Sequence, residues 1–399
     1  MLRVDRELTV AFVATFAMIL NVGIIIIAMQ IIFFDVVSDF EIALISTVYW
    51  IPIFLLTSIW GYIADVTGER KRLAIATQLI VSFLTYLHMV FSSYHQILIL
   101  RFLTGIFSSA YLPCVQGYLT LDRKPEEFGY VLGVYNTAVA FGFFISGILS
   151  SVCLYLVDPL ELIIFAGLAS LMSSILLILL PSKPRIRREE PPSKMFSSLA
   201  SIRLIGELRR GKAYFLVLSL AIRHLAIMGI FSVVYVYMQR VGIDRVCVGY
   251  VSAMNSFVQT TLIHPLSRLS DRIGRKKLFV SGFLLSSFIP ITLMFARTLI
   301  DFILAFIVIG TAYSTMIAGA NPYLRDVAPK SKISEILSLT NTTRAFGMIF
   351  GPILVGFLVT HHSYTLAFSV LFILGLISTF LSLFTEEIYQ KEYIINQRN

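Results

Sequence analysis

Charged side chains are scarce in this sequence of 399 residues. Asp, Glu, Lys and Arg together make up 14% of it, whereas soluble domains carry about 25%. Hydrophobic residues make up 57% of the chain, and the mean hydropathy is +0.84. A water-soluble fold of this composition would have to expose most of its apolar side chains, so a lipid bilayer is the expected solvent.

Several motifs of enzymes and metal proteins are also missing. The three cysteines, Cys114, Cys153 and Cys247, form no CxxC spacing, and we interpret them as packing residues. No GxxxxGK[ST] loop occurs, which argues against ATP as the energy source. The adjacent His361 and His362 lack further ligands and read as a polar turn. No catalytic or metal-binding constellation is found, so we expect neither an enzyme nor a cofactor.

Long apolar runs fill the rest of the sequence. A membrane-spanning helix needs about 20 apolar residues, and twelve runs approach or exceed that length. The first begins after Arg3 and Arg6, exceeds 20 residues and has no small-residue cleavage site, so we expect a spanning helix and not a signal peptide. The runs cover residues 8–32, 41–64, 73–92, 97–120, 128–152, 160–181, 213–238, 247–268, 277–296, 299–324, 333–358 and 364–385.

The distribution of Lys and Arg predicts the orientation of these helices. If the N-terminus is cytoplasmic, 26 of the 32 Lys and Arg residues fall in segments on the inside. Such an excess is typical of cytoplasmic loops. The basic net charge of +9 therefore indicates membrane topology and not nucleic-acid binding. Both termini are predicted to lie in the cytoplasm. The protein itself is predicted to span the cytoplasmic (plasma) membrane of the cell.

The one long polar break divides the apolar runs into six and six. Residues 183–212 are rich in Pro and Arg, and we expect a cytoplasmic linker that also touches anionic lipid head groups. On either side, NTAVAFGFFISGIL at 136–149 resembles NTTRAFGMIFGPIL at 341–354, which indicates an internal duplication. The predicted domains are therefore a six-helix bundle over 1–182, the loop 183–212, and a second six-helix bundle over 213–399.

Two loops carry a motif that recurs in both halves. Residues 61–73 read GYIADVTGERKRL, and residues 267–277 read SRLSDRIGRKK. Both resemble the cytoplasmic signature of the major facilitator superfamily, GxLaDrxGrkxxl, although Val66, Glu69 and Ser267 depart from it. With the helix count, the six-plus-six division and the central loop, the resemblance covers the whole chain. It implies an all-α membrane protein of twelve transmembrane helices in two pseudo-symmetric bundles.

In that family this loop motif is understood as a latch that closes the cytoplasmic side. Gly permits a tight turn and close helix approach, and a carboxylate there can dock on the N-terminus of a neighbouring helix. By symmetry, Asp65 is expected near residues 331–334, and Asp271 near the start of the segment 128–152. A topology anchor without a role in gating is the alternative. The predicted gate residues are Gly61, Asp65, Gly68, Arg70, Asp271, Gly274, Arg275 and Lys276.

Two further features resemble motifs of the same family. Arg101 with Gly105 matches a helix-4 motif whose Arg is associated with proton coupling, although Arg101 can also reach the interface from its position near the outer boundary. The run 333–358 carries a glycine-proline pattern that resembles one in the family's antiporters. Close helix packing is the alternative explanation for Gly347, Gly351 and Pro352 in this run, and for Gly142 in the run 128–152, which lacks the proline.

Ionisable residues at membrane depth are candidates for the substrate site, because they are costly unless they face a cavity or a partner. Arg223 and Arg344 each lie about ten residues into a spanning segment, which is roughly 15 Å along a helix. No Asp or Glu is expected at that depth, so the cavity should suit an anion. Structural arginines that only hold the bundle together are the alternative. The nearby polar candidates for substrate binding or coupling are His224, Asn255, Gln259 and Asn341.

These features predict a secondary transporter that moves a small solute by alternating access. Its driving force would be proton symport or antiport, or exchange with a second solute. Two substrate classes remain open, namely drug-like compounds for efflux and small organic anions. The expected partners are the substrate, protons or a counter-solute, and the lipid bilayer, with no nucleic acid, and the protein should be monomeric. A membrane sensor that binds a solute without transporting it is the alternative function.

Overall fold

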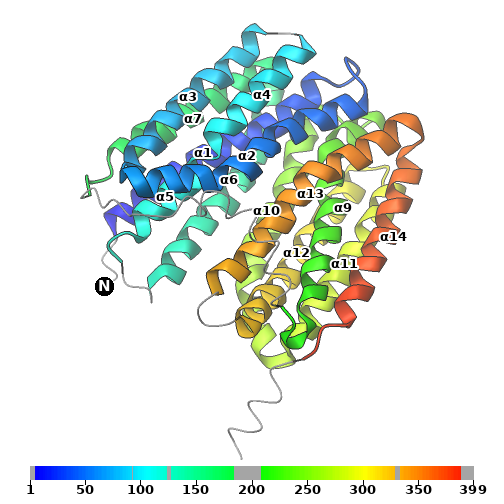
Figure 1. The fold of residues 1–399 in the computed structure, drawn as a ribbon. Coiled ribbons are helices and arrows are strands. Elements are labelled where there is room, and N and C mark those ends of the chain that lie inside the picture. The colour runs from blue at the N-terminus through cyan, green and yellow to red at the C-terminus, as the bar shows by residue number, and fades with distance from the viewer. Residues whose placement is uncertain (1–4, 92, 124–126, 184–207, 329–332, 388–399) are drawn as a thin grey trace, which may run out of the picture. The chain divides into compact units, whose positions relative to one another are not determined.

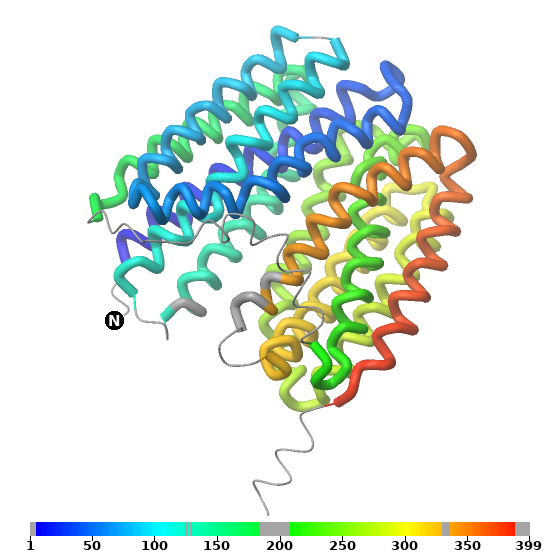
Figure 2. Tube along the Cα trace, viewed as in Figure 1, coloured from blue at the N-terminus to red at the C-terminus, as the bar shows by residue number. Residues whose placement is uncertain are grey.

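A computed structural model describes residues 5–91, 93–123, 127–183, 208–328 and 333–387. Over these residues the chain is almost entirely helical, and twelve of its helical segments are long and apolar enough to span a membrane. The prediction of an all-α protein with twelve spanning helices is confirmed. Figures 1 and 2 follow the helices from the first to the last.

The helices match the apolar runs of the sequence, with ends that differ by a few residues. Their bounds are α1 (Arg6–Ile32), α2 (Asp39–Thr67), α3 (Arg70–Val90), α4 (Tyr94–Ser108), α5 (Tyr111–Thr120), α6 (Phe128–Leu156), η2 (Pro159–Glu161), α7 (Leu162–Ile178), η5 (Arg210–Lys212), α9 (Tyr214–Arg240), α10 (Arg245–Ile273), α11 (Arg275–Phe295), α12 (Leu299–Val327), α13 (Ile333–His361) and α14 (Tyr364–Leu383).

The run 97–120, expected as one helix, is instead divided into α4 and α5 around Ser109 and Ala110. Pro113 contributes to the break, because a proline ring clashes with the carbonyl group four residues earlier, and here that residue is Ser109. The hydroxyl of Ser109 donates to the carbonyl of Ile106 at 2.6 Å. The two short helices together still make one candidate span, Tyr94–Thr120.

The chain divides into two compact units. The first contains residues 1–37, 44–198 and 244–253. In it α1 packs against α6 and α7, and α3 packs against α4, α5 and α7. Polar side chains join these helices in the interior. The amide of Asn21 on α1 donates to the hydroxyl of Thr85 on α3 at 3.1 Å and to the carbonyl of Ala166 on α7 at 2.9 Å. Such bonds give polar groups the hydrogen-bond partners that lipid does not provide.

The second unit contains residues 38–43, 199–243 and 254–399. Here α9 packs against α13 and α14, and α11 packs against α12 and α14. Residues 38–43 at the start of α2 belong to this unit through Asp39, which is 7% exposed. Its carboxylate accepts from Arg240 at 2.7 Å and from the hydroxyl of Tyr364 at 2.8 Å. The carboxylate therefore fixes three helix ends of this unit in one place.

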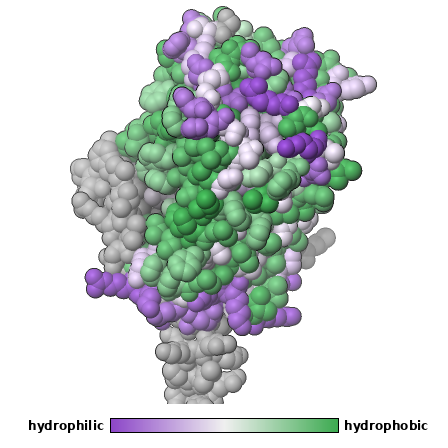
Figure 3. All heavy atoms as spheres, turned by 90° about the vertical axis from the view of Figure 1, so that its right-hand side faces the viewer, coloured by the Kyte–Doolittle hydropathy of each residue, from purple (hydrophilic) through white to green (hydrophobic). Residues whose placement is uncertain are grey.

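The outer surface also fits a lipid environment. Figure 3 shows a face with a broad hydrophobic area and with hydrophilic residues gathered at two opposite ends. Long apolar side chains project outward from α14, where Ile373, Phe380 and Leu383 are 50–60% exposed. Apolar side chains that face outward cost little free energy in hydrocarbon, whereas in water they would form a large exposed patch.

Candidate substrate site in the second unit

The candidate site begins where α9 and α13 cross at very short distance. A Cβ atom on Gly351 would lie 2.4 Å from the carbonyl oxygen of Leu225, and one on Gly347 would lie 2.4 Å from the carbonyl carbon of His224. Only glycine allows two helix backbones to approach this closely. The crossing therefore places Arg223 and His224 of α9 beside Thr343 and Arg344 of α13.

Arg223 is buried, with 2% of its surface exposed. Its Nε donates to the hydroxyl of Ser286 on α11 at 3.2 Å. The guanidinium carbon lies 5.3 Å from the centre of the Tyr313 ring on α12. Nη1 and Nη2 are buried without a hydrogen-bond partner. A guanidinium has five N–H donors, so most of the donors of Arg223 remain available to an acceptor.

Arg344 meets the same tyrosine. Its Nη2 donates to the hydroxyl of Tyr313, and its guanidinium carbon lies 5.4 Å from the ring centre. Nε of Arg344 is also buried without a partner. Two positive charges thus share one aromatic ring, which attracts each by about 0.5–2 kcal/mol. Within the part of the chain that the structure describes, no carboxylate forms an ion pair with either arginine.

His224 lies next to this pair and is fully buried. Its Nδ1 lies 3.2 Å from the hydroxyl of Thr343, and its Nε2 has no partner. The hydroxyl of Thr343 in turn donates to the carbonyl of Thr340 at 2.9 Å. Because that hydroxyl proton is already used, Nδ1 of His224 is the donor to Thr343. Nε2 is then an acceptor in the neutral ring.

The other polar candidates from the sequence lie apart from this cluster. Gln259 on α10 donates to the amide oxygen of Asn255 at 2.9 Å, so these two side chains bind each other. Asn341 is exposed. Arg101 belongs to the first unit, is 5% exposed, and places its guanidinium 4.2 Å from the centre of the Tyr49 ring. Burial of this side chain argues against the alternative that it reaches the interface.

The first motif loop forms its own ion pair. Arg70 bonds to Asp65, and its side chain is only 4% exposed. Gly68 has a φ of 71°, a conformation in which glycine is favoured. A Cβ on Gly61 would be in ordinary contact with Pro113. The sequence did not predict that the nearest partner of Asp65 lies in the same loop.

The second motif loop pairs differently. Arg275 bonds to Asp326 at the end of α12 and donates to the carbonyl of Pro322 at 2.6 Å. Its Nη2 also lies 3.8 Å from Asp271, which is largely exposed. Gly274 has a φ of 100°, and Lys276 is half-buried. This loop is therefore fastened to α12 by its arginine.

The docking predicted for the two motif carboxylates stays a prediction. The partner expected for Asp65, residues 331–334, lies outside the described residues or in side chains that are not described.

The glycines singled out in the sequence lie where helices approach each other closely. A Cβ on Gly142 of α6 would lie 2.7 Å from Ile19 of α1, and Gly347 and Gly351 lie at the α9–α13 crossing. Pro352 lies within α13.

Sequence reasoning missed two members of the central cluster, Ser286 and Tyr313. Tyr313 is one of 18 tyrosines in the chain, and it lies 31 positions before Arg344. No spacing within one helix relates the two residues, because they come from neighbouring helices that packing alone brings together. A polar aromatic residue halfway along an apolar run was the available signal.

The twelve helices among the described residues that are long and apolar enough to cross a membrane define a polytopic membrane protein. The chain belongs to the Major Facilitator Superfamily, whose family model matches residues 11–254 and 216–396. This family consists of transporters and not enzymes. The resemblance inferred from the two motif loops is confirmed.

Individual relatives are distant. An uncharacterized MFS-type transporter of Methanocaldococcus jannaschii is 24% identical over 89% of this chain and 92% of its own. A multi-drug resistance efflux pump PmrA homolog of Lactococcus lactis is 21% identical over 78% of this chain and 77% of its own. The crystal structure of the nucleoside transporter NupG has the same fold, with a TM-score of 0.79 at 12% identity over 94% of this chain and 98% of that chain.

Proposed function

We propose that this transporter carries a small organic anion by alternating access and binds it at Arg223 and Arg344. One observation carries the proposal. Both η nitrogens of Arg223 are buried without a partner, in a cluster that contains a second arginine and, among the residues that the structure describes, no carboxylate paired with either arginine. An unpaired charge in the membrane costs several kcal/mol, and a substrate carboxylate or phosphate would relieve that cost.

The geometry favours a ligand with at least one carboxylate or phosphate group. A guanidinium matches two oxygens of such a group with two parallel N–H donors. Arg344 offers its Nε as a further unpartnered donor, and Tyr313 holds the two guanidinium groups on one ring. His224, through the acceptor Nε2, would take a proton during coupling or a hydrogen bond from the substrate.

The remaining parts of the proposal follow the family pattern. We place the protein in the cytoplasmic membrane, with both termini in the cytoplasm and with domains 1–182 and 213–399 joined by the loop 183–212. The loops at Asp65 and Asp271 would latch the cytoplasmic side. Proton coupling or solute exchange would drive transport, with Arg101 as a second candidate for coupling. We propose a monomer as the working form.

A thermal-shift screen of the purified protein tests the anion site. Succinate, benzoate and glucose phosphate serve as anions, and tetraphenylphosphonium serves as a drug-like cation. An anion should raise the melting temperature of the wild type, and Arg223→Gln and Arg344→Gln should weaken its apparent affinity by roughly ten- to a hundredfold. Arg272→Gln is the matched control, because Arg272 is exposed on α10 and should behave as the wild type.

Two results would contradict the proposal. Anion stabilisation that survives both substitutions would remove the arginine site. Stabilisation by the cation alone would favour efflux of drug-like compounds, the second candidate, for which the similarity to the efflux pump homolog of Lactococcus lactis is the supporting observation. Uptake of the stabilising anion into proteoliposomes separates a transporter from a sensor, since a sensor binds without flux.

A further inference from the structure

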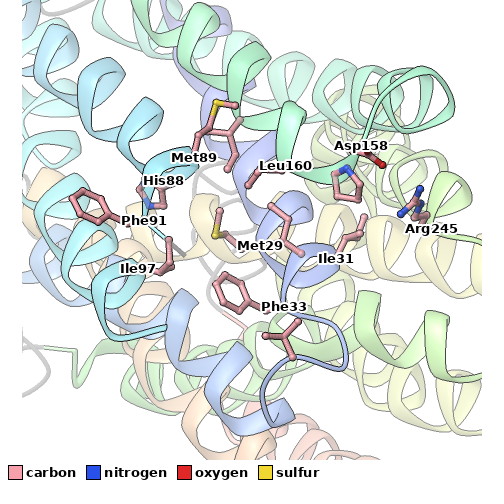
Figure 4. A pocket seen from close by; sticks show the side chains of 14 residues that line it. Met29, Ile31, Phe33, His88, Met89, Phe91, Ile97, Asp158, Leu160 and Arg245 are labelled. Carbon is pink, nitrogen blue, oxygen red and sulfur yellow. The ribbon is translucent and has the colours of Figure 1, made fainter. Parts of the chain in front are cut away.

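The first unit contains a cavity that is unrelated to the arginine cluster of the second unit. It has a volume of about 490 Å³ and lies where α1 and α3 end and where α4 and α7 begin (Figure 4). By the predicted orientation this is the outer side of the membrane. Pockets for small molecules have volumes of about 300–1,000 Å³, so the cavity has room for one compact ligand.

The walls of the cavity are apolar and partly aromatic. Met29 and Phe33 come from α1, Phe91 follows α3, and Ile97 comes from α4. Met29, Phe33 and Ile97 are each no more than 5% exposed. Phenylalanine rings stack with other aromatic rings, and methionine sulfur makes favourable contacts with them while it adapts to their shape. The walls therefore suit an aromatic ligand.

One polar side chain in the wall lacks a partner. His88 on α3 is 3% exposed, and its Nδ1 lies 2.8 Å from the carbonyl oxygen of Leu84. Because a carbonyl only accepts, Nδ1 carries the proton. In the neutral ring Nε2 is then an acceptor, and it is buried without a hydrogen-bond partner. A ligand that donates an O–H would satisfy this atom.

The mouth of the cavity argues against a charged ligand. Asp158 and Arg245 both line the cavity and are exposed, so the charges at the mouth are of opposite sign. Val36 and Leu160 also line it and are 68% and 42% exposed, which gives apolar access. None of the buried residues described around the cavity carries a charge, so an ion would lose its hydration without a paired charge among them, whereas a neutral hydroxyl would lose less and could regain a hydrogen bond.

We propose that this cavity binds an uncharged aromatic alcohol, whose hydroxyl donates to Nε2 of His88 and whose rings pack against Phe33, Phe91 and Met29. The site does not depend on the proposed anion site, because all of its residues lie in the first unit. Loss of either site would leave the other intact.

Binding of naphthol to the purified protein in nanodiscs tests the proposal, with empty nanodiscs as the control for partition into lipid. Naphthol should bind about fivefold more tightly than methoxynaphthalene, which has the same rings but no donor, since one hydrogen bond contributes about that factor. His88→Leu should abolish this preference, and His88→Gln, which keeps an acceptor, should retain part of it. Ile97→Trp, which fills the cavity, should abolish binding of both compounds.

Equal binding of the two compounds by the wild type would overturn the proposal, and so would binding that Ile97→Trp leaves unchanged. If His88→Leu fails to fold, two results still test the proposal. They are the ratio of the wild type's affinities for the two compounds, and the loss of binding in Ile97→Trp. Arg223→Gln is the matched variant in the other unit and should bind naphthol as the wild type does.

Discussion

At the scale of single residues, Tyr313 organises the candidate anion site. Arg223 and Arg344 come from α9 and α13, and each guanidinium carbon lies within 5.4 Å of the centre of this ring from α12. Two like charges repel each other, so their shared position requires something negative between or beside them. The aromatic face and the phenolic oxygen of Tyr313 supply part of this negative potential, and the proposed anion supplies the remainder.

Tyr313→Phe should therefore have a smaller effect than Tyr313→Leu. The Phe variant keeps the ring and loses the hydrogen bond from Arg344, which contributes about 1.5–3 kcal/mol for a charged donor. The Leu variant also loses about 0.5–2 kcal/mol of attraction for each guanidinium. Melting temperature and anion affinity of the purified variants measure both effects. Equal values for the two variants would show that the ring is not needed to hold the arginines.

At the scale of helices, close backbone approach decides which side chains meet. Gly351 of α13 faces Gly229 of α9, where a Cβ would lie 2.7 Å from the Gly229 nitrogen. The same crossing brings His224 to Thr343. A wider separation of α9 and α13 would separate the two arginines as well, so the crossing and the site depend on each other.

Gly351→Ala should consequently destabilise the protein by about 1–3 kcal/mol, because the new methyl group overpacks the crossing. The matched control is Gly133→Ala on α6, where a Cβ would meet nothing within 4 Å. There alanine should be neutral or favourable by up to about 1 kcal/mol through its higher helix propensity. Thermal unfolding in detergent compares the two variants, and equal destabilisation would contradict the role of the crossing.

The start of α1 offers a pH-dependent contact outside the spanning segments. Asp5 caps the helix by accepting from the backbone N–H of Glu7 and Leu8 at 3.1 and 3.3 Å, and it pairs with Arg123. Burial would raise the pKa of Asp5, but the bonds from Arg123 and from the backbone outweigh burial and lower the pKa below its ordinary value of 3.8. The ionised carboxylate is therefore favoured in the folded state.

Because the pKa is lower in the folded state, the stability that Asp5 contributes is fully present above pH 3.8 and is lost as the pH falls through the folded pKa. Asp5→Asn should remove this part of the acid sensitivity and lower the melting temperature at neutral pH. Melting curves between acid and neutral pH measure both effects. Asp158→Asn, at an exposed carboxylate, should keep the acid sensitivity of the wild type.

At the scale of the whole molecule, the placement of Lys and Arg carries the predicted topology. Of the 32 such residues, 26 lie in segments predicted to face the cytoplasm. The twelve spans found in the structure match the twelve apolar runs from which that topology was inferred. If all twelve cross the membrane, their even number would place both ends of the chain on one side, as predicted.

Labelling with a membrane-impermeant maleimide tests this topology in a background without Cys114, Cys153 and Cys247. The cysteine introduced by His362→Cys, in the turn between α13 and α14, should react in intact cells. A cysteine at Ser198→Cys, within the segment 183–212, should react only after the membrane is permeabilised. Reaction of Ser198→Cys in intact cells would overturn the orientation and with it the cytoplasmic position of the two motif loops.

The sequence by itself determined the solvent, the number of spans and the family. Apolar runs of sufficient length specify spanning helices because lipid leaves backbone groups no other partners. The motif loops around Asp65 and Asp271 indicated the family because their glycines and charges occur twice at nearly one offset. The sequence did not determine the break at Ser109, because Pro113 alone does not imply one: Pro52 and Pro265 lie inside unbroken helices.

Only the tertiary structure decided which polar side chains meet. It brought Arg223, Tyr313 and Arg344 together from three helices, paired Arg275 with Asp326, and left Nε2 of His88, a residue in the lining of a cavity, without a hydrogen-bond partner. Hydropathy fixes where a helix crosses the membrane, but its rotation and its neighbours depend on contacts with other helices. The spacing of Gly347 and Gly351 indicated close helix packing, but it did not indicate that α9 would be the partner of α13.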